Sequence, residues 1–95
     1  MSCDETAQRL AELNAIKKLV LKEKNSKNIV AGVLFFPAVS GNQDNVQQTI
    51  AAVNTRKEVL SDIYQSNECV NDIPTYTIEQ IKQMIDNNQV RELQS

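Results

Sequence analysis

The two cysteines, Cys3 and Cys69, are the side chains of this sequence with the clearest capacity for chemistry. The 95-residue chain contains no histidine, which removes Cys–His and Ser–His catalytic pairs and the commonest zinc ligand. Two cysteines alone are too few for a zinc site. Neither thiol has a base or a CxxC partner nearby in sequence, which disfavours a reactive nucleophile. A disulfide, two unrelated thiols and a modified thiol are the alternatives.

The acidic residues are spread singly along the chain. Glu58 and Asp62 are four apart on one predicted helix, but neither lies in an apolar stretch that would raise its pKa for general acid catalysis. There is no glycine-rich phosphate loop. We therefore expect a solvated helix face, no catalytic residues, no metal and no cofactor: the protein is not expected to be an enzyme.

Composition favours a small helical domain. Aromatic residues make up 4% of the chain, and glycine and proline occur twice each, whereas an all-β fold normally needs more of both. The net charge of -2 argues against nucleic acid as a partner. Basic residues of the first helix give only a weak basis for DNA or RNA binding, because no aromatic residues alternate with them for base stacking.

Residues 4–24 predict the first helix. Ser2 is a candidate cap, with Glu5 closing a capping box. Apolar residues recur at steps of three and four, which defines one buried face. That face comprises Leu10, Leu13, Ile16 or Lys17, and Val20, and it is widened by Ala7, Ala11, Leu19 and Leu21.

Residues 43–66 predict a second helix of similar length. Apolar residues recur at alternating steps of four and three, the a/d spacing of a coiled coil, and Lys57 is the one charged residue in this row. We call this row the seam. The seam consists of Val46, Ile50, Val53, Lys57, Leu60 and Tyr64. We expect Ile50, Val53 and Leu60 to be buried, and Gln47, Gln48 and Glu58 to be exposed.

Residues 70–76 predict a linker around Pro74, because the residue before a proline avoids the helical region. Thr77 is a fair cap for a shorter third helix, although the acid at Glu79 is misplaced for a capping box with Thr77. The apolar face of this helix is Ile78, Ile81 and Ile85, with Met84 beside it. Asn87–Asn88 weakens the helix, and Val90 and Leu93 are expected to continue it.

Together these elements predict an all-α fold: an antiparallel, coiled-coil-like helical hairpin over residues 1–69, then a linker and a short C-terminal helix over residues 70–95. Phe36 lies midway between Cys3 and Cys69 in the sequence, so a hairpin that turns there brings both cysteines to its open end. One interpretation is a disulfide, worth up to about 4 kcal/mol. A simple hairpin requires the two Cα atoms to lie within about 15 Å of each other.

The connection between the two long helices is apolar throughout residues 29–39. Eleven residues are too few to span a bilayer as a helix. Three interpretations are open: the segment packs into the core, it contacts a membrane, or it contacts a second copy of the chain. The predicted contact residues are Leu34, Phe35, Phe36, Pro37, Lys22, Lys24 and Lys27. Together with Lys17 and Lys18, the three lysines make up half of the ten cations, and lysines beside an apolar loop suit anionic head groups.

The order of these features resembles small bacterial lipoproteins of the cell envelope. Mature chains of that family start at a cysteine lipidated on its thiol and amine. The resemblance implies that Cys3 of Cys-Asp-Glu-Thr-Ala-Gln-Arg-Leu is the lipid attachment site, with Met1–Ser2 replacing a removed signal peptide. Many chains of the family have a polar helix, a short apolar stretch and a second polar helix that ends near a cysteine. Residues 28–39 resemble the apolar stretch, and residues 65–69 resemble the end of the second helix. A lipidated Cys3 would not be able to bond to Cys69.

The resemblance, which covers residues 3–69, implies a periplasmic protein anchored to the outer membrane through Cys3. Its expected function is non-enzymatic: to bind or shield an envelope protein or a membrane surface through the apolar hairpin tip. The alternative is a cytoplasmic helical protein-interaction module of the chaperone, inhibitor or antitoxin kind. A signal peptide ending in a lipobox before Cys3 would favour the first, and a reading frame that begins at Met1 the second.

Overall fold

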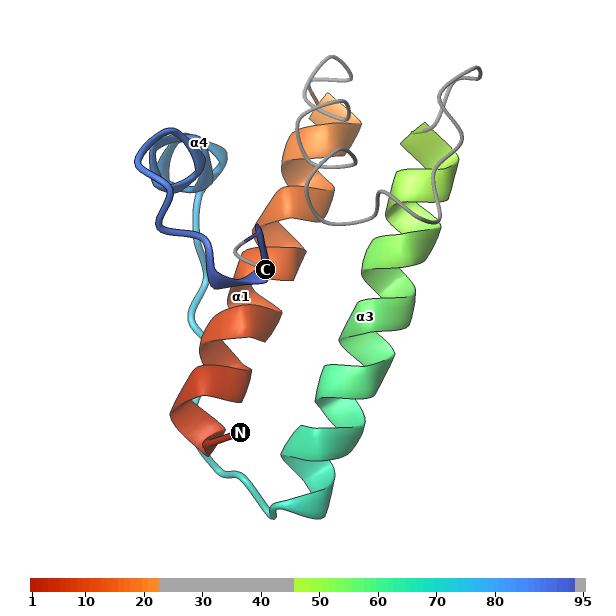
Figure 1. Ribbon diagram of the computed structural model, residues 1–95, viewed down its shortest axis with the longest axis vertical. Coiled ribbons are helices and arrows are strands. Elements are labelled where there is room, and N and C mark those ends of the chain that lie inside the picture. The colour runs from red at the N-terminus through yellow and green to blue at the C-terminus, as the bar shows by residue number, and fades with distance from the viewer. Residues whose placement is uncertain (23–45, 94–95) are drawn as a thin grey trace.

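The computed structural model describes residues 1–22 and 46–93, and every regular element in these two ranges is helical. Helix α1 (Cys3–Lys22) and helix α3 (Val46–Ser66) run antiparallel side by side, and α4 (Ile78–Asp86) lies on the opposite side of α1, seen nearly end-on in Figure 1. A short 3₁₀ helix, Arg91–Leu93, follows. The predicted all-α helical hairpin with a shorter C-terminal helix is confirmed.

Helix α1 is the middle element, because it packs against α3 on one side and against α4 and the 3₁₀ helix on the other. Its apolar side chains are therefore buried around much of its circumference, which explains the wide apolar face seen in the sequence. The buried apolar residues of α1 are Ala7, Leu10, Ala11, Leu13, Ala15, Ile16, Leu19 and Val20. The prediction for Leu21 is wrong: it lies in the last turn of α1 and is 55% exposed.

The start of α1 is fixed by Ser2. Its hydroxyl accepts the backbone N–H of Glu5 at 3.1 Å, and its carbonyl accepts the hydroxyl of Thr6 at 2.8 Å. Ser2 therefore caps the helix as predicted. The Glu5 carboxylate, expected to complete a capping box, contacts the guanidinium groups of Arg9 and Arg91 instead.

Helix α3 presents its predicted seam to α1. Val53 and Leu60 are fully buried, Glu58 is exposed, and Ile50 is only half-buried but packs against the core. Gln47 and Gln48 belong to α3, but their side chains lie outside the described residues. Lys57 is half-buried between the two buried seam residues, so the charged interruption of the seam does face the interior.

Helix α4 begins at the predicted cap, Thr77, whose hydroxyl accepts the N–H of Gln80. The Gln80 side chain accepts the N–H of Thr77 in return, which completes a capping box with glutamine rather than an acid. The helix ends at Asp86, and Asn88 takes a left-handed backbone conformation with φ of 56°. This turn redirects the chain, so the expectation that Val90 continues the helix is wrong. Val90 is fully buried in a separate segment that crosses α1.

Candidate functional site

The open end of the hairpin is closed by a disulfide between Cys3 and Cys69, with the two Cα atoms 5.5 Å apart. This agrees with the placement expected from the midpoint at Phe36. Polar contacts surround the bond: the Tyr64 hydroxyl donates to the Asn71 carbonyl, and the Asn71 amide donates to Asp4. The first residues of α1 and the linker after α3 are thus joined both covalently and by hydrogen bonds.

The disulfide bears on the lipid attachment site implied for Cys3. A thioether-linked lipid and a disulfide both require the same sulfur atom, so one molecule cannot carry both. The structure uses the sulfur of Cys3 in the bond to Cys69. The two assignments of Cys3 are therefore exclusive, and the structure is that of the disulfide form.

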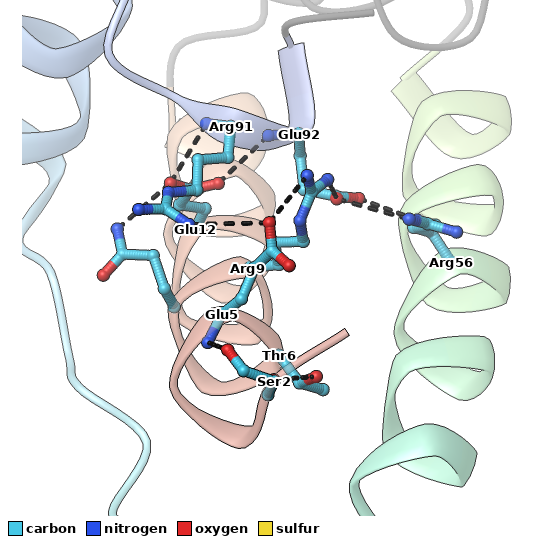
Figure 2. Close-up of polar contacts among 9 residues, drawn as sticks. Ser2, Glu5, Thr6, Arg9, Glu12, Arg56, Arg91 and Glu92 are labelled. Atoms are coloured by element: carbon cyan, nitrogen blue, oxygen red, sulfur yellow. Dashed lines mark hydrogen bonds and ion pairs between the residues drawn. The ribbon is translucent and has the colours of Figure 1, made fainter.

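The most concentrated polar site is an ion-pair cluster around Glu92, whose side chain is 1% exposed. Arg9 of α1 donates to its carboxylate at 2.5 Å, and Arg56 of α3 donates at 2.8 Å. Figure 2 shows Glu92 between the two guanidinium groups. One residue of the C-terminal segment therefore binds both helices of the hairpin.

A second buried acid, Glu12, holds the backbone of the same segment. Its carboxylate accepts the backbone N–H groups of Arg91 and Glu92, each at 3.1 Å (Figure 2). These N–H groups begin the 3₁₀ helix, where no intrahelical acceptor is available for them. The Gln8 amide donates to Glu12 at 3.0 Å and accepts the Tyr76 hydroxyl at 2.6 Å, which connects this cluster to the linker.

The acidic side chains of the cluster offset the burial of the Arg9 guanidinium group. Burial lowers the pKa of Arg9, but the hydrogen bond and charge of Glu92, together with Glu5, outweigh burial and raise that pKa above its ordinary value. Arg9 therefore stays cationic and Glu92 keeps its counter-ions. Both carboxylates are already bound by donors, so the arrangement holds the C-terminal segment against the two long helices. We call Arg9, Glu12, Arg56 and Glu92 the clasp.

Sequence reasoning did not find this cluster. Arg9 and Glu12 are neighbours on one helix, but Arg56 and Glu92 are far from them and from each other in the sequence. Each of the four resembles an ordinary surface charge. The one available signal was the unusually wide apolar face of residues 4–24, which indicates a helix covered on two sides. On such a helix Glu12, between Ala11 and Leu13, falls on a buried side.

Two lysines face each other across the seam. The Lys17 ammonium donates to Asn54 of α3 at 3.2 Å, and Lys57 lies one turn further along α3. Burial lowers the pKa of Lys57, and the positive charge of Lys17 lowers it further. The charged interruption of the seam is therefore a local electrostatic cost to the hairpin.

The other predicted contact residues divide into two groups. Lys22 is exposed at the last residue of α1. Leu34, Phe35, Phe36, Pro37, Lys24 and Lys27 lie outside the described residues.

Glu58 and Asp62 both lie on the outer surface of α3, as expected of a solvated face. Within residues 1–22 and 46–93 no three metal-binding side chains gather in one place. None of the helices described has the length and apolar character needed to cross a membrane.

Comparisons were made with family models, curated proteins and solved structures. None of the three gives a match to this chain, so its function has to be inferred from its own residues.

Proposed function

We propose that this chain is a non-enzymatic binding protein of an oxidising compartment such as the bacterial periplasm. Its disulfide-closed hairpin presents the apolar connection 29–39 to another component of the cell envelope. The observation that carries the proposal is the Cys3–Cys69 disulfide, in which both cysteines of the chain are used.

The disulfide supports the compartment. Disulfides persist in secreted and periplasmic proteins and are rare in the cytosol, where thiols are kept reduced. The bond also suits a small domain, since a chain of this size buries only about 60% of its unfolded surface and benefits from a covalent crosslink. It favours the envelope location over the cytoplasmic module.

The charged side chains of the interior support a binding role over a catalytic one. The Glu12 carboxylate accepts hydrogen bonds from backbone N–H groups, and the Glu92 carboxylate accepts them from guanidinium groups. A general acid or base needs a free proton-transfer path to a substrate, whereas these groups hold the fold together. The apolar run 29–39 is the part of the sequence that we propose for contact with a partner, because it carries no charged side chain.

The compartment is tested by the redox state of the protein in its own cells. Thiols are blocked with iodoacetamide in intact cells, and the mass of the intact chain is then measured. An unmodified chain with an oxidised pair is the expected result. Two alkylated cysteines would instead show the cytoplasmic module, and an acyl mass on Cys3 would show the lipid-anchored form.

The binding role is tested with Phe35→Ser/Phe36→Ser. The matched control is Val59→Ser, which changes an exposed apolar residue of α3. Binding is measured by co-sedimentation with isolated envelope membranes and with vesicles of extracted lipid, and the thermal midpoint is followed alongside. The double variant should lose binding and keep its midpoint, while the control keeps both. A large fall in midpoint would place the two phenylalanines in the core, since each buried Phe is worth about 3–5 kcal/mol.

Two further readouts separate the kinds of partner. Binding to envelope membranes but not to lipid vesicles would identify a protein component, and equal binding to both would identify the lipid surface. Sedimentation equilibrium without any membrane reports self-association through the same segment. Unchanged binding by the double variant in every assay would refute the proposed role of residues 29–39.

A further inference from the structure

A groove runs between the C-terminal half of α1 and the linker before α4. Its volume is about 320 Å³, at the lower end of the range of small-molecule sites, roughly 300–1,000 Å³. One wall is α1 and the other is the segment Pro74–Tyr76. The residues that line it are Asn14, Ala15, Lys17, Lys18, Leu21, Pro74, Thr75 and Tyr76.

The walls of this groove are held in place by the interior of the protein. The Tyr76 hydroxyl donates to Gln8, and Gln8 donates to the buried Glu12. The next residue, Thr77, caps α4, which packs against α1. The linker wall is thus fixed at its C-terminal end, so a ligand would enter a largely preformed site.

The groove combines an apolar surface with one available ammonium group. Ala15, Leu21, Pro74 and the Tyr76 ring supply the apolar surface, and Leu21 is 55% exposed there. The groove lining contains no carboxylate. Lys17 directs its ammonium group to Asn54 on α3, which leaves Lys18 as the cation of the groove.

The positive charge of Lys18 has no acidic side chain beside it on helix α1. Side chains three and four positions away are its neighbours on a helix surface, and these are Asn14, Ala15, Leu21 and Lys22. None of them is acidic, and Lys22 is a like charge. An anion beside Lys18 and Asn14, with an apolar chain along Leu21 and Pro74, would satisfy both features of the groove.

We propose that this groove binds a single-chain amphiphile with a carboxylate head group, the chemical class of a medium-chain fatty acid. Lys18 and the Asn14 amide hold the carboxylate, and the apolar side chains cover the hydrocarbon. The lining residues do not include residues 29–39, so the proposal is tested independently of the function proposed above.

The test is a titration of the ¹⁵N-labelled full chain with decanoate, followed by NMR below the concentration at which micelles form. Backbone signals of Asn14, Lys18, Leu21 and Thr75 should shift together and saturate. Decanol, which has the same chain without the charge, should bind more weakly. Lys18→Gln should weaken decanoate binding roughly fivefold, the size of one exposed ion pair, and Leu21→Ser should weaken both ligands.

The matched control is Lys22→Gln, which removes an exposed lysine of the same helix that does not line the groove. It should leave decanoate affinity unchanged. An equal loss in Lys18→Gln and Lys22→Gln would show general charge attraction and overturn the site. The site is also overturned if decanol binds as well as decanoate, or if the shifts concentrate in residues 29–39 instead of the groove.

Discussion

Glu12 and Glu92, two buried acids from opposite ends of the chain, are in direct contact: the backbone N–H of Glu92 donates to the Glu12 carboxylate at 3.1 Å. Each acid is stabilised by a different kind of donor. Glu12 binds backbone N–H groups at the start of the 3₁₀ helix, and Glu92 binds Arg9 and Arg56. This division allows two carboxylates to be buried in a domain of only 95 residues.

Replacing Glu92 by Gln should destabilise the protein. The change removes the carboxylate charge that Arg56 and Arg9 share and leaves Arg9 with its weaker contact to Glu5. A poorly compensated charge in the interior is costly. Because the Arg9 and Arg56 side chains are 21% and 36% exposed, water screens part of this cost, and we expect a loss of about 2 kcal/mol. Urea unfolding measures it. Glu58→Gln, on the exposed side of α3, is the control and should stay within about 0.5 kcal/mol of the wild type.

Replacing Glu12 by Gln should loosen the C-terminal segment specifically. A glutamine amide keeps one acceptor but turns a donor toward the second backbone N–H, which costs about 1–3 kcal/mol. The amides of Arg91 and Glu92 should then exchange with deuterium much faster, while amides in the middle of α3 change less. Equal acceleration at both places would mean that Glu12 supports the whole fold and not this segment.

Two valines of α3, one in the seam and one outside it, give a matched pair of variants that tests the assignment of the seam. Val53 is fully buried and Val59 is 44% exposed. Val53→Asp should unfold the domain, because an unpaired charge in the core costs several kcal/mol of a total of about 5–15 kcal/mol. Val59→Asp should melt close to the wild type. Circular dichroism melts check both, and similar midpoints for the two variants would show that the seam is misassigned.

Loss of the disulfide should lower stability whichever cysteine is removed. The bond spans 66 residues, and closing a loop of this length is worth about 4 kcal/mol in the chain-entropy model. Cys3→Ser, Cys69→Ser and the double variant should therefore lose the same amount, and reduction of the wild type should match them. A larger loss in the double variant than in either single one would show that each cysteine also has a packing role.

The Lys17–Lys57 pair predicts a pH dependence. Because the pKa of Lys57 is lowered in the folded protein, the unfolded chain binds that proton more tightly. The free energy of unfolding should then rise as the pH increases through the folded pKa toward the unfolded value of about 10.4. Lys57→Met should be more stable than the wild type at pH 7, by less than about 1 kcal/mol since Lys57 is only half-buried. Urea unfolding at pH 7, 8.5 and 10 should show this advantage shrinking, and a constant advantage would contradict the electrostatic explanation.

Periodicity was sufficient to predict the helices. The a/d spacing around Val53 and Leu60 placed the seam of α3, and Thr77 marked the start of α4. The midpoint argument also placed Cys3 and Cys69 at one end of the hairpin. These inferences succeed because each depends on neighbouring residues or on simple chain geometry.

The clasp was beyond such reasoning because its members are joined only by tertiary structure. Nothing local to Glu92 indicates that two arginines from different helices meet its carboxylate. The course of the chain after Asn88 is a similar case, since a left-handed turn at one asparagine decides whether Val90 extends α4 or crosses α1. Local propensity does not fix that choice; the packing of Val90 against the core does.

The bond between Cys3 and Cys69 also has a topological consequence. It turns residues 3–69 into a covalent ring, from which the C-terminal segment extends as a tail. An enzyme that unfolds proteins by pulling on this tail can extract the linker and α4 one residue at a time. At Cys69 it reaches the closed loop, and from there two segments of the chain have to pass side by side. The oxidised protein should therefore resist threading through a narrow pore, and passage across a membrane as a single strand has to precede formation of the bond.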